Sequence, residues 1–308
     1  MGNRELLVSI CVSTYNSSKT ILETLDSIYS QTYSNLQLIV SDDGSKDDTV
    51  CIVKEWMSAK KMRFINPQIL TVTNNTGTSA NSNRAFRAAD GVWIKGIAGD
   101  DVLFPDAIEK CIRYVADKPM IKWLFAKAVF YKNRISKDCI IEDKSEKFQI
   151  YNDLNSLDAR KQLEKNYLGN YFKCPTHFLR KDLVDSVGGF DEDFGILEDY
   201  PMWLRILQYG EKCYYMDEFI MGYRISDTNV SVFNNSFVNR KMLDLTFNAQ
   251  KKYILCHCPK HYRYNIVLTY WIRRLFSSCF FNKNRKLDVL FYRFCLRSVN
   301  FFTLELIH

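Results

Sequence analysis

The sequence predicts an α/β protein, in which a mostly parallel sheet is flanked by helices and a C-terminal helical extension follows. Three observations predict this class. Apolar, β-branched segments alternate four times with helix-type segments in the first 117 residues. The strand-type segments lack polar alternation, which is typical of a parallel sheet covered on both faces. Residues 234–308 contain only helix-type segments, rich in aromatic and basic side chains.

The first half of the chain has a regular order of elements. Strands are expected at residues 5–13, 36–41, 68–73 and 92–98, and the helices that follow them at residues 19–31, 49–59, 79–89 and 106–116. The first of these helices shows the spacing of one buried face, with Ile21, Leu25 and Ile28 in line.

The second half is less regular. We expect strands at 120–131 and 171–180, helices at 181–190 and 198–210, and surface loops or hairpins over 132–153. The resulting division is a domain over 1–233, with halves 1–117 and 118–233, and a helical region over 234–308.

Composition and charge narrow the class of protein. With 308 residues, 47% hydrophobic and 25% charged, the chain can bury a large core. Its ten cysteines are scattered and fit reduced thiols, so a cytoplasmic protein is expected. Residues 251–308 carry 11 Lys/Arg against 2 Asp/Glu, and this basic excess explains the net charge of +7. No apolar run reaches the ~18 residues that span a bilayer.

Polar clusters follow three of the predicted strands, namely "STYN", "SDDGS" and "AGDD". Because parallel α/β sheets bind ligands at the carboxyl ends of their strands, these clusters should meet at one edge. A single Asp pair is more often a helix cap or a solvated turn. Two acidic turns at one edge repel each other, and a divalent cation between them relieves that repulsion. Oxygen ligands favour Mg²⁺ or Mn²⁺, often shared with substrate phosphates.

Other nucleotide and metal motifs are missing. The sequence has no EF-hand loop, no P-loop lysine motif and no GxGxxG. ATP hydrolysis and dinucleotide binding are therefore not favoured. A nucleotidyltransferase on a similar sheet remains an alternative, although "STYNSSKT" lacks the phosphate loop it needs. A non-catalytic protein that binds sugar nucleotides is a second alternative.

Three blocks resemble the family 2 glycosyltransferases of the GT-A fold, in the order of that family. They are "VSICVSTYNSSKTILETLDSIYSQTYSNLQLIVSDDGSKDDT", "NNTGTSANSNRAFRAADGVWIKGIAGDD" and "GGFDEDFGILEDYPMWLRI". The resemblance covers roughly residues 6–225. It implies transfer of a sugar from a nucleotide sugar, with inversion at the anomeric carbon.

The resemblance also implies roles for residues of the donor site. Ser13 and Tyr15 should border the nucleotide base, and Asp43 should accept a hydrogen bond from the uracil N–H of a UDP-sugar. Arg84 should approach the base or diphosphate. Asp100 should contact the ribose.

The same resemblance assigns the metal and the base. Asp101 should hold Mn²⁺ or Mg²⁺ on the diphosphate, and Asp199 should be the catalytic base, with Glu198 near the sugar or acceptor. A carboxylate can take the proton of the acceptor hydroxyl, and the metal can stabilise the departing diphosphate.

The chain departs from relatives in two respects. It lacks the QxxRW motif and the membrane helices of processive synthases, which favours transfer of a single sugar. Where many relatives have a metal-binding His after "YR", this chain has Ser226. His177 is a weak substitute, and a core or acceptor-lining position is expected for it.

The family resemblance and the basic residues 251–308 indicate the kind of acceptor and the location of the protein. We expect a glycan or lipid-linked glycan acceptor in bacterial surface polysaccharide assembly. The helical spacing of aromatic and basic residues in 251–308 fits contact with an anionic membrane, at the inner face of the plasma membrane, or packing on the core. Nucleic acid is not expected as a partner, because no RNA-binding sheet motif is present.

Overall fold

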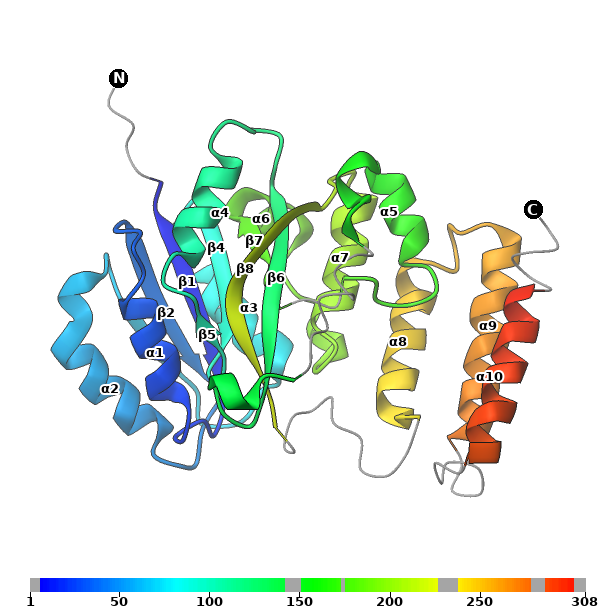
Figure 1. Cartoon of the computed structure of the whole chain (residues 1–308), viewed down its shortest axis with the longest axis horizontal. Coiled ribbons are helices and arrows are strands. Elements are labelled where there is room, and N and C mark those ends of the chain that lie inside the picture. The colour runs from blue at the N-terminus through cyan, green and yellow to red at the C-terminus, as the bar shows by residue number, and fades with distance from the viewer. Residues whose placement is uncertain (1–5, 142–150, 173–174, 227–237, 278–285, 302–308) are drawn as a thin grey trace.

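An eight-stranded sheet forms the centre of the protein in a computed structural model (Figure 1). The structure describes residues 6–141, 151–172, 175–226, 238–277 and 286–301. The strand order is β3-β2-β1-β4-β7-β6-β8-β5. Strands β3, β2, β1 and β4 are parallel, as are β6 and β8, whereas β7 and β5 are antiparallel to their neighbours. The predicted mostly parallel α/β class is confirmed.

The strands have the following bounds: β1 Val8–Thr14, β2 Leu36–Asp42, β3 Gln68–Thr71, β4 Trp93–Ala98, β5 Val102–Leu103, β6 Trp123–Lys132, β7 Phe178–Arg180 and β8 Tyr214–Ile225. The α-helices are α1 Ile21–Tyr29, α2 Thr49–Lys60, α3 Thr78–Arg87, α4 Ala107–Val115, α5 Ala159–Lys165, α6 Lys181–Val187, α7 Asp199–Gln208, α8 Arg240–Tyr253, α9 Lys260–Phe276 and α10 Lys286–Asn300.

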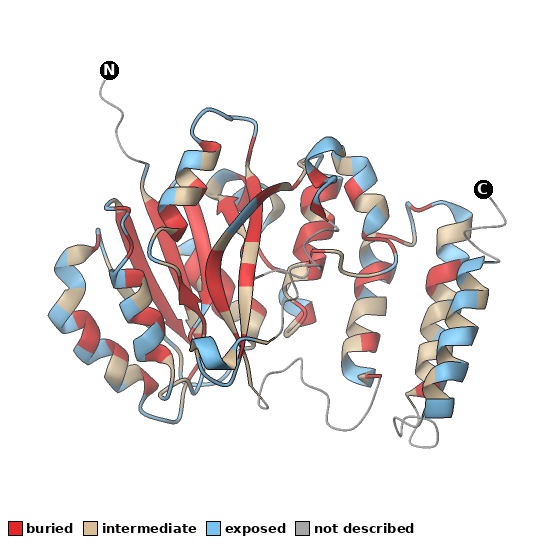
Figure 2. Cartoon of the chain, in the orientation of Figure 1, coloured by how far each residue is buried: buried red, intermediate tan, exposed pale blue. Residues whose placement is uncertain are grey.

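Burial explains why these segments are strands. Every residue of β2 is buried, and five of the six residues of β4 are, so both faces of the sheet centre are covered (Figure 2). Strands of this kind read as continuous apolar runs rather than alternating ones. The four strands and four helices expected in the first half are confirmed, with ends shifted by at most three residues.

The second half differs from expectation in three ways. The longest strand, β8, was not predicted, because its segment carries Asp217, Glu218 and Arg224 among apolar residues. Helix α5 was also missed. Only Phe178–Arg180 of the strand expected at 171–180 is a strand, and residues 173–174 lie outside the described part.

The C-terminal helices α8, α9 and α10 lie at one end of the long axis (Figure 1). The predicted helical extension is therefore present, although the predicted boundary at 233/234 falls outside the described residues. Helix α7 shares a small core with this region, formed by Tyr200 and Leu204 with Ala249, Ile254 and Ile266. Within the described chain, no helix is long and apolar enough to cross a membrane.

Candidate active site

The carboxyl ends of β2, β1 and β4 are level with one another. In the strand register Thr14 is opposite Asp42, and Ser13 is opposite Ala98. The polar clusters that follow these strands therefore emerge at one edge of the sheet, as the sequence predicted. This edge is where parallel α/β sheets bind their ligands.

Asp43 is buried and rigidly held at the end of β2. Its carboxylate accepts hydrogen bonds from the Thr76 N–H at 3.0 Å and the Gly77 N–H at 2.8 Å, and from the Thr76 hydroxyl at 2.5 Å. The guanidinium of Arg84 lies 3.5 Å away. The structure therefore brings together Asp43 and Arg84, two residues that were each predicted to contact the nucleotide.

The preceding residue, Asp42, has a local role. Its carboxylate accepts hydrogen bonds from the N–H groups of Gly44 and Ser45, at 3.0 and 2.9 Å. Gly44 has a φ of +78°, and a Cβ there would lie 3.0 Å from the backbone of Asn74. The turn "DDGS" therefore fixes its own backbone with Asp42 and leaves Asp43 directed toward the neighbouring loop.

Ser13 and Tyr15 line the end of β1. The Ser13 hydroxyl lies 3.0 Å from the Ser82 hydroxyl of α3, so β1 and α3 are held together here. The side chain of Tyr15 stays exposed at 45%. Tyr15 directly follows Thr14, whose carbonyl accepts a hydrogen bond from the Asp43 N–H at 3.0 Å, and an exposed aromatic ring can stack on a planar base.

The turn "AGDD" brings the acidic pair close to β1. The Gly99 N–H donates to the Ser13 carbonyl at 3.0 Å. A Cβ at Gly99 would lie 2.7 Å from the Thr14 hydroxyl oxygen and 2.9 Å from the Thr14 Cβ. Only glycine permits this approach, and it places Asp100 and Asp101 next to the β1 cluster.

Arg224 of β8 organises the acidic pair. Its N–H donates to the Asp101 carboxylate at 2.8 Å, and its Nε–H donates to the Asp100 carbonyl at 2.8 Å. Its guanidinium also donates to the Asn133 carbonyl at 2.7 Å and pairs with Glu23 of α1. The arginine is buried, so α1, the segment after β6, β8 and the "AGDD" turn are joined at one point.

The electrostatics of the pair favour a cation. Burial, and then the charge of Asp100, raise the pKa of Asp101 well above its usual value, while Arg224 and Lys95 act in the opposite direction. Burial also raises the pKa of Asp100. Two crowded carboxyls of this kind are stabilised in the ionised form by a divalent ion.

The donor set fits Mg²⁺ or Mn²⁺ shared with a substrate. In the described part of the chain, no group of three or more His, Cys, Asp or Glu residues could hold a metal by itself. One or two carboxylates completed by phosphate and water is the usual arrangement for Mg²⁺. Asp100 and Asp101 are two such carboxylates.

Asp199 and Glu198 begin α7. Asp199 is the first helical residue, and its carboxylate accepts hydrogen bonds from the Asn170 side-chain amide and the Tyr200 N–H, both at 2.7 Å. Glu198 is at the N-cap position, with no side-chain cap hydrogen bond. Burial, and then the charge of Asp199, raise the pKa of Glu198 to about 8. At neutral pH this shift favours the protonated form of Glu198.

A loop contact joins the Asp199 side of the protein to the donor side. The Gly195 carbonyl, four residues before Asp199, accepts hydrogen bonds from the N–H and hydroxyl of Ser79, at 3.1 and 2.8 Å. Ser79 is in α3, the helix that carries Arg84. The start of α7 is therefore tied to the helix that borders Asp43.

Three residues of the site were not found from the sequence. Arg224 was noted only for its position two residues before Ser226, and Asn170 was not noticed. Lys95 is fully buried in β4, where its ammonium donates to the carbonyls of Gly96 and Pro175, at 2.7 and 3.0 Å. A charged residue inside an apolar strand was the available signal for Lys95, because such a charge needs buried partners. Arg224 gave no such signal, because its segment did not read as a strand.

His177 occupies a core position, one of the two positions expected for it. It lies between Phe86 and Trp203, with ring centroids at 6.3 and 5.7 Å. Burial, and then the charge of Lys95, lower its pKa well below the usual value. Gly96 lies directly against the imidazole ring, since a Cβ at Gly96 would lie only 2.6 Å from the His177 Nε2.

Comparison with known proteins gives a family match and related sequences. The family model "Glycosyl transferase family 2" matches residues 9–184. Chondroitin synthase of Escherichia coli is 30% identical over 206 residues, which cover 66% of this chain and 27% of that protein. The E. coli protein named UDP-Glc:alpha-D-GlcNAc-diphosphoundecaprenol beta-1,3-glucosyltransferase WfaP is 27% identical over 282 residues, covering 91% of this chain and 98% of that protein.

Solved structures with a similar fold are known. S. aureus TarS 1–349 in complex with UDP-GlcNAc has a TM-score of 0.63 at 16% identity, with 97% of this chain and 82% of that chain covered. The mannosyltransferase PcManGT of Pyrobaculum calidifontis, in complex with GDP-Man and Mn²⁺, has a TM-score of 0.55 at 16% identity, with 95% and 72% covered. At such identities the likeness shows the fold.

Proposed function

Since this chain belongs to glycosyl transferase family 2 and has the GT-A fold, we propose that it transfers a single sugar from a UDP-sugar, with inversion, to a glycan or lipid-linked glycan acceptor. One observation carries the proposal. The Asp100–Asp101 pair, the Asp43–Arg84 contact and the exposed Tyr15 all lie at the ends of three adjacent parallel strands. A metal-bridged nucleoside diphosphate fits that arrangement of charges.

The donor is proposed to carry uracil. Asp43 is a fixed acceptor whose oxygens accept from Thr76, Gly77 and Arg84, so the N–H of that base would replace one of these donors. Tyr15 offers a ring for stacking. TarS has been solved with UDP-GlcNAc, and WfaP is named for UDP-Glc, which supports the proposal. PcManGT was solved with GDP-Man, so the family fold accepts other nucleotides and the base has to be tested.

The proposed metal ligand is Asp101, with Asp100 directed at the ribose. Mn²⁺ or Mg²⁺ would supply Lewis-acid stabilisation of the charge that develops on the leaving diphosphate. Arg224 holds the turn through the Asp101 carboxylate and the Asp100 carbonyl, so it is proposed as a positioning residue. Arg84 is placed to meet the base or the diphosphate.

Asp199 is proposed as the catalytic base. In a single displacement the acceptor oxygen bonds to the anomeric carbon, the bond from that carbon to the diphosphate breaks, and the hydroxyl proton passes to Asp199. The hydrogen bond from Asn170 fixes the orientation of this carboxylate. Glu198 next to it is proposed to contact the sugar or acceptor.

The acceptor is proposed to be a lipid-linked intermediate in surface polysaccharide biosynthesis. WfaP, which aligns over nearly its whole length, is named for a diphosphoundecaprenol acceptor. Chondroitin synthase is much longer than this chain, so its activity is a weaker guide. A cytoplasmic protein at the inner face of the plasma membrane fits such an acceptor.

A nucleotide panel tests the donor and the metal together. UDP, CDP and GDP are compared for their effect on melting temperature, each with and without Mn²⁺. We expect UDP with Mn²⁺ to stabilise most, because Asp43 pairs with the uracil N–H. Asp101→Ala should remove the dependence on Mn²⁺ while the fold remains intact. A wild type that prefers CDP or GDP would contradict the uracil assignment, and an Asp101→Ala variant that keeps the Mn²⁺ effect would contradict the metal assignment.

A further inference from the structure

Helices α9 and α10 carry apolar side chains that the fold does not bury. None of the fifteen residues of α10 is buried, although all of them are described. Eight large apolar residues of the two helices are exposed, with Trp271 at 60% and Phe294 at 66%. The eight are Tyr264, Leu268, Trp271, Leu275, Leu287, Leu290, Phe291 and Phe294, and together they are named the apolar surface here.

Each helix presents its part of this surface as one stripe. The members on α9 are spaced by four, three and four residues, and those on α10 by three, one and three, so each set lies on one face of its helix. The opposite side of α9 is already occupied. There Tyr270 stacks on Phe247 of α8, with ring centroids 3.8 Å apart, and its hydroxyl bonds to Asp244 at 3.0 Å.

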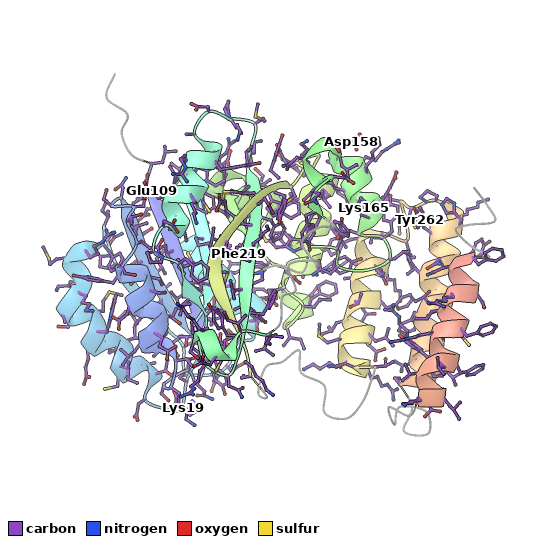
Figure 3. All side chains as sticks on the ribbon, in the orientation of Figure 1. Lys19, Glu109, Asp158, Lys165, Phe219 and Tyr262 are labelled. Atoms are coloured by element: carbon purple, nitrogen blue, oxygen red, sulfur yellow. The ribbon has the colours of Figure 1, made fainter. Side chains whose placement is uncertain are left out.

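The two stripes face the same side of the hairpin. The helices are antiparallel, because Asn265 bonds to Asn300 at 2.9 Å and Phe276 contacts Tyr292. At ~100° per residue, the exposed stripe of each helix lies roughly 110° from its line of contact with the other helix. Because the two helices run antiparallel, equal offsets from the α9–α10 contact line place both stripes on the same side of the helix pair. That side faces away from α8, so the two stripes form one surface. Side chains project outward from this end of the molecule in Figure 3.

Basic residues border the apolar surface. Helices α9 and α10 contain seven Lys/Arg and one Asp/Glu. Lys286, Arg293 and Arg297 form a stripe along α10 next to its apolar residues, and Lys260 continues the α9 stripe. Apolar side chains flanked by basic ones are the pattern of a helix that lies in the interface of an anionic bilayer.

We propose that the apolar surface docks on an anionic lipid membrane, with Trp271 and Phe294 entering the headgroup region and Arg293 and Arg297 meeting lipid phosphates. A second copy of the chain would present the same basic residues and so repel this surface, whereas anionic lipid complements it. Residues 1–250 carry 31 basic and 33 acidic side chains, so the excess positive charge of the chain belongs to residues 251–308, which include this surface. This docking is independent of which sugar is transferred.

The test uses the full-length protein and vesicles of phosphatidylcholine with or without phosphatidylglycerol. Trp271 is an internal reporter, because the other four tryptophans are buried. We expect sedimentation with the anionic vesicles alone, loss of binding as salt rises, and quenching of Trp271 by brominated lipid. Trp271→Ser/Leu275→Ser/Phe294→Ser should bind roughly tenfold more weakly or worse. The matched control is Leu22→Ser/Met62→Ser, at exposed apolar positions away from α9 and α10, and it should bind as the wild type does.

Two further measurements keep the test decisive. Arg293→Gln/Arg297→Gln leaves the apolar residues in place, so if the triple variant fails to fold, this variant should still show weaker binding and a smaller salt effect. Equal vesicle binding by a folded triple variant would overturn the proposal. A wild-type protein that dimerises through this surface and does not bind vesicles would also overturn the proposal. The UDP-dependent melting shift is measured on the same samples, so failure of docking and failure of the donor assignment are told apart.

Discussion

At the residue scale, Asp199 can be a catalytic base or only a polar residue at a helix start. Asp199→Asn separates the two roles, because the Asn amide oxygen can still accept the hydrogen bond from the Tyr200 N–H but cannot take a proton as a carboxylate does. We expect normal folding and normal UDP-sugar binding, with turnover lowered by about 10²–10⁴-fold. Turnover and melting temperature are measured together. Turnover within a few-fold of the wild type would place the base elsewhere, with Glu198 as the next residue to test.

Glu198 gives a prediction on pH and stability. Its pKa is about 8 in the folded protein against 4.5 as the ordinary value, since burial and Asp199 favour the protonated form. The folded state therefore holds this proton more tightly than the unfolded chain does. The contribution of Glu198 to the free energy of unfolding is therefore fully present below about pH 4.5, and it is lost as the pH rises to about 8.

Glu198→Gln removes that titration. We expect its free energy of unfolding to fall less than that of the wild type between about pH 5 and pH 8, by denaturant titration at each pH. The control is Glu55→Gln on the exposed side of α2, which should follow the wild-type profile. Parallel profiles for the wild type and Glu198→Gln would show that the carboxyl is not destabilised at high pH.

At the element scale, the loop before α7 is fastened to α8. Asp191 accepts hydrogen bonds from the Lys252 ammonium, at 2.7 Å, and from the Tyr253 hydroxyl. Burial alone would raise the pKa of Asp191, but these bonds lower it overall. Because the same loop reaches Ser79 of α3 through Gly195, it connects the donor side, the start of α7 and the C-terminal region.

Asp191→Asn should loosen this connection. Charge-assisted hydrogen bonds contribute about 1.5–3 kcal/mol, so we expect a loss of that order in unfolding free energy, with faster amide exchange over residues 188–199. Asp193→Asn is the matched control, because Asp193 also contacts Lys252 but is largely exposed, and exposed pairs contribute about 0–1 kcal/mol. Equal losses from both variants would argue against a special role for Asp191.

Prediction from the sequence succeeded for elements whose pattern is local. Strands β1 to β4 read as continuous apolar runs because both of their faces are covered, and each is followed by a helix with clear spacing. Strand β8 does not read as a continuous apolar run, because it contains the charged Arg224. This residue is buried in the fold by partners from α1, the "AGDD" turn and the segment after β6, which are distant in the sequence. The strand-end clusters were found because parallel strands end at one edge, whereas Lys95 and Asn170 depend on distant contacts.

At the scale of the whole molecule, the C-terminal helices differ in how many buried side chains they contribute to the core that they share with α7. Ala249, Ile254, Cys258 and Ile266 complete a core with Tyr200 and Leu204 of α7. Helix α10 contributes no buried residue and packs beside α9. Removing α8 and α9 should therefore affect the folding of the α7 region, whereas removing α10 should not.

Two truncations test this difference. A chain that ends at residue 277 should fold and keep its UDP-dependent melting shift, with a small loss of stability from contacts of Tyr292 with Phe276. A chain that ends at residue 237 should lose most of its stability, because several buried side chains at about 1.5–3 kcal/mol each approach the ~5–15 kcal/mol that stabilises a typical domain. Circular dichroism and nucleotide binding report both results. If the shorter chain folded and bound UDP as well as the full chain, helices α8 and α9 would be an independent appendage, and the α7 core would have to be stable without them.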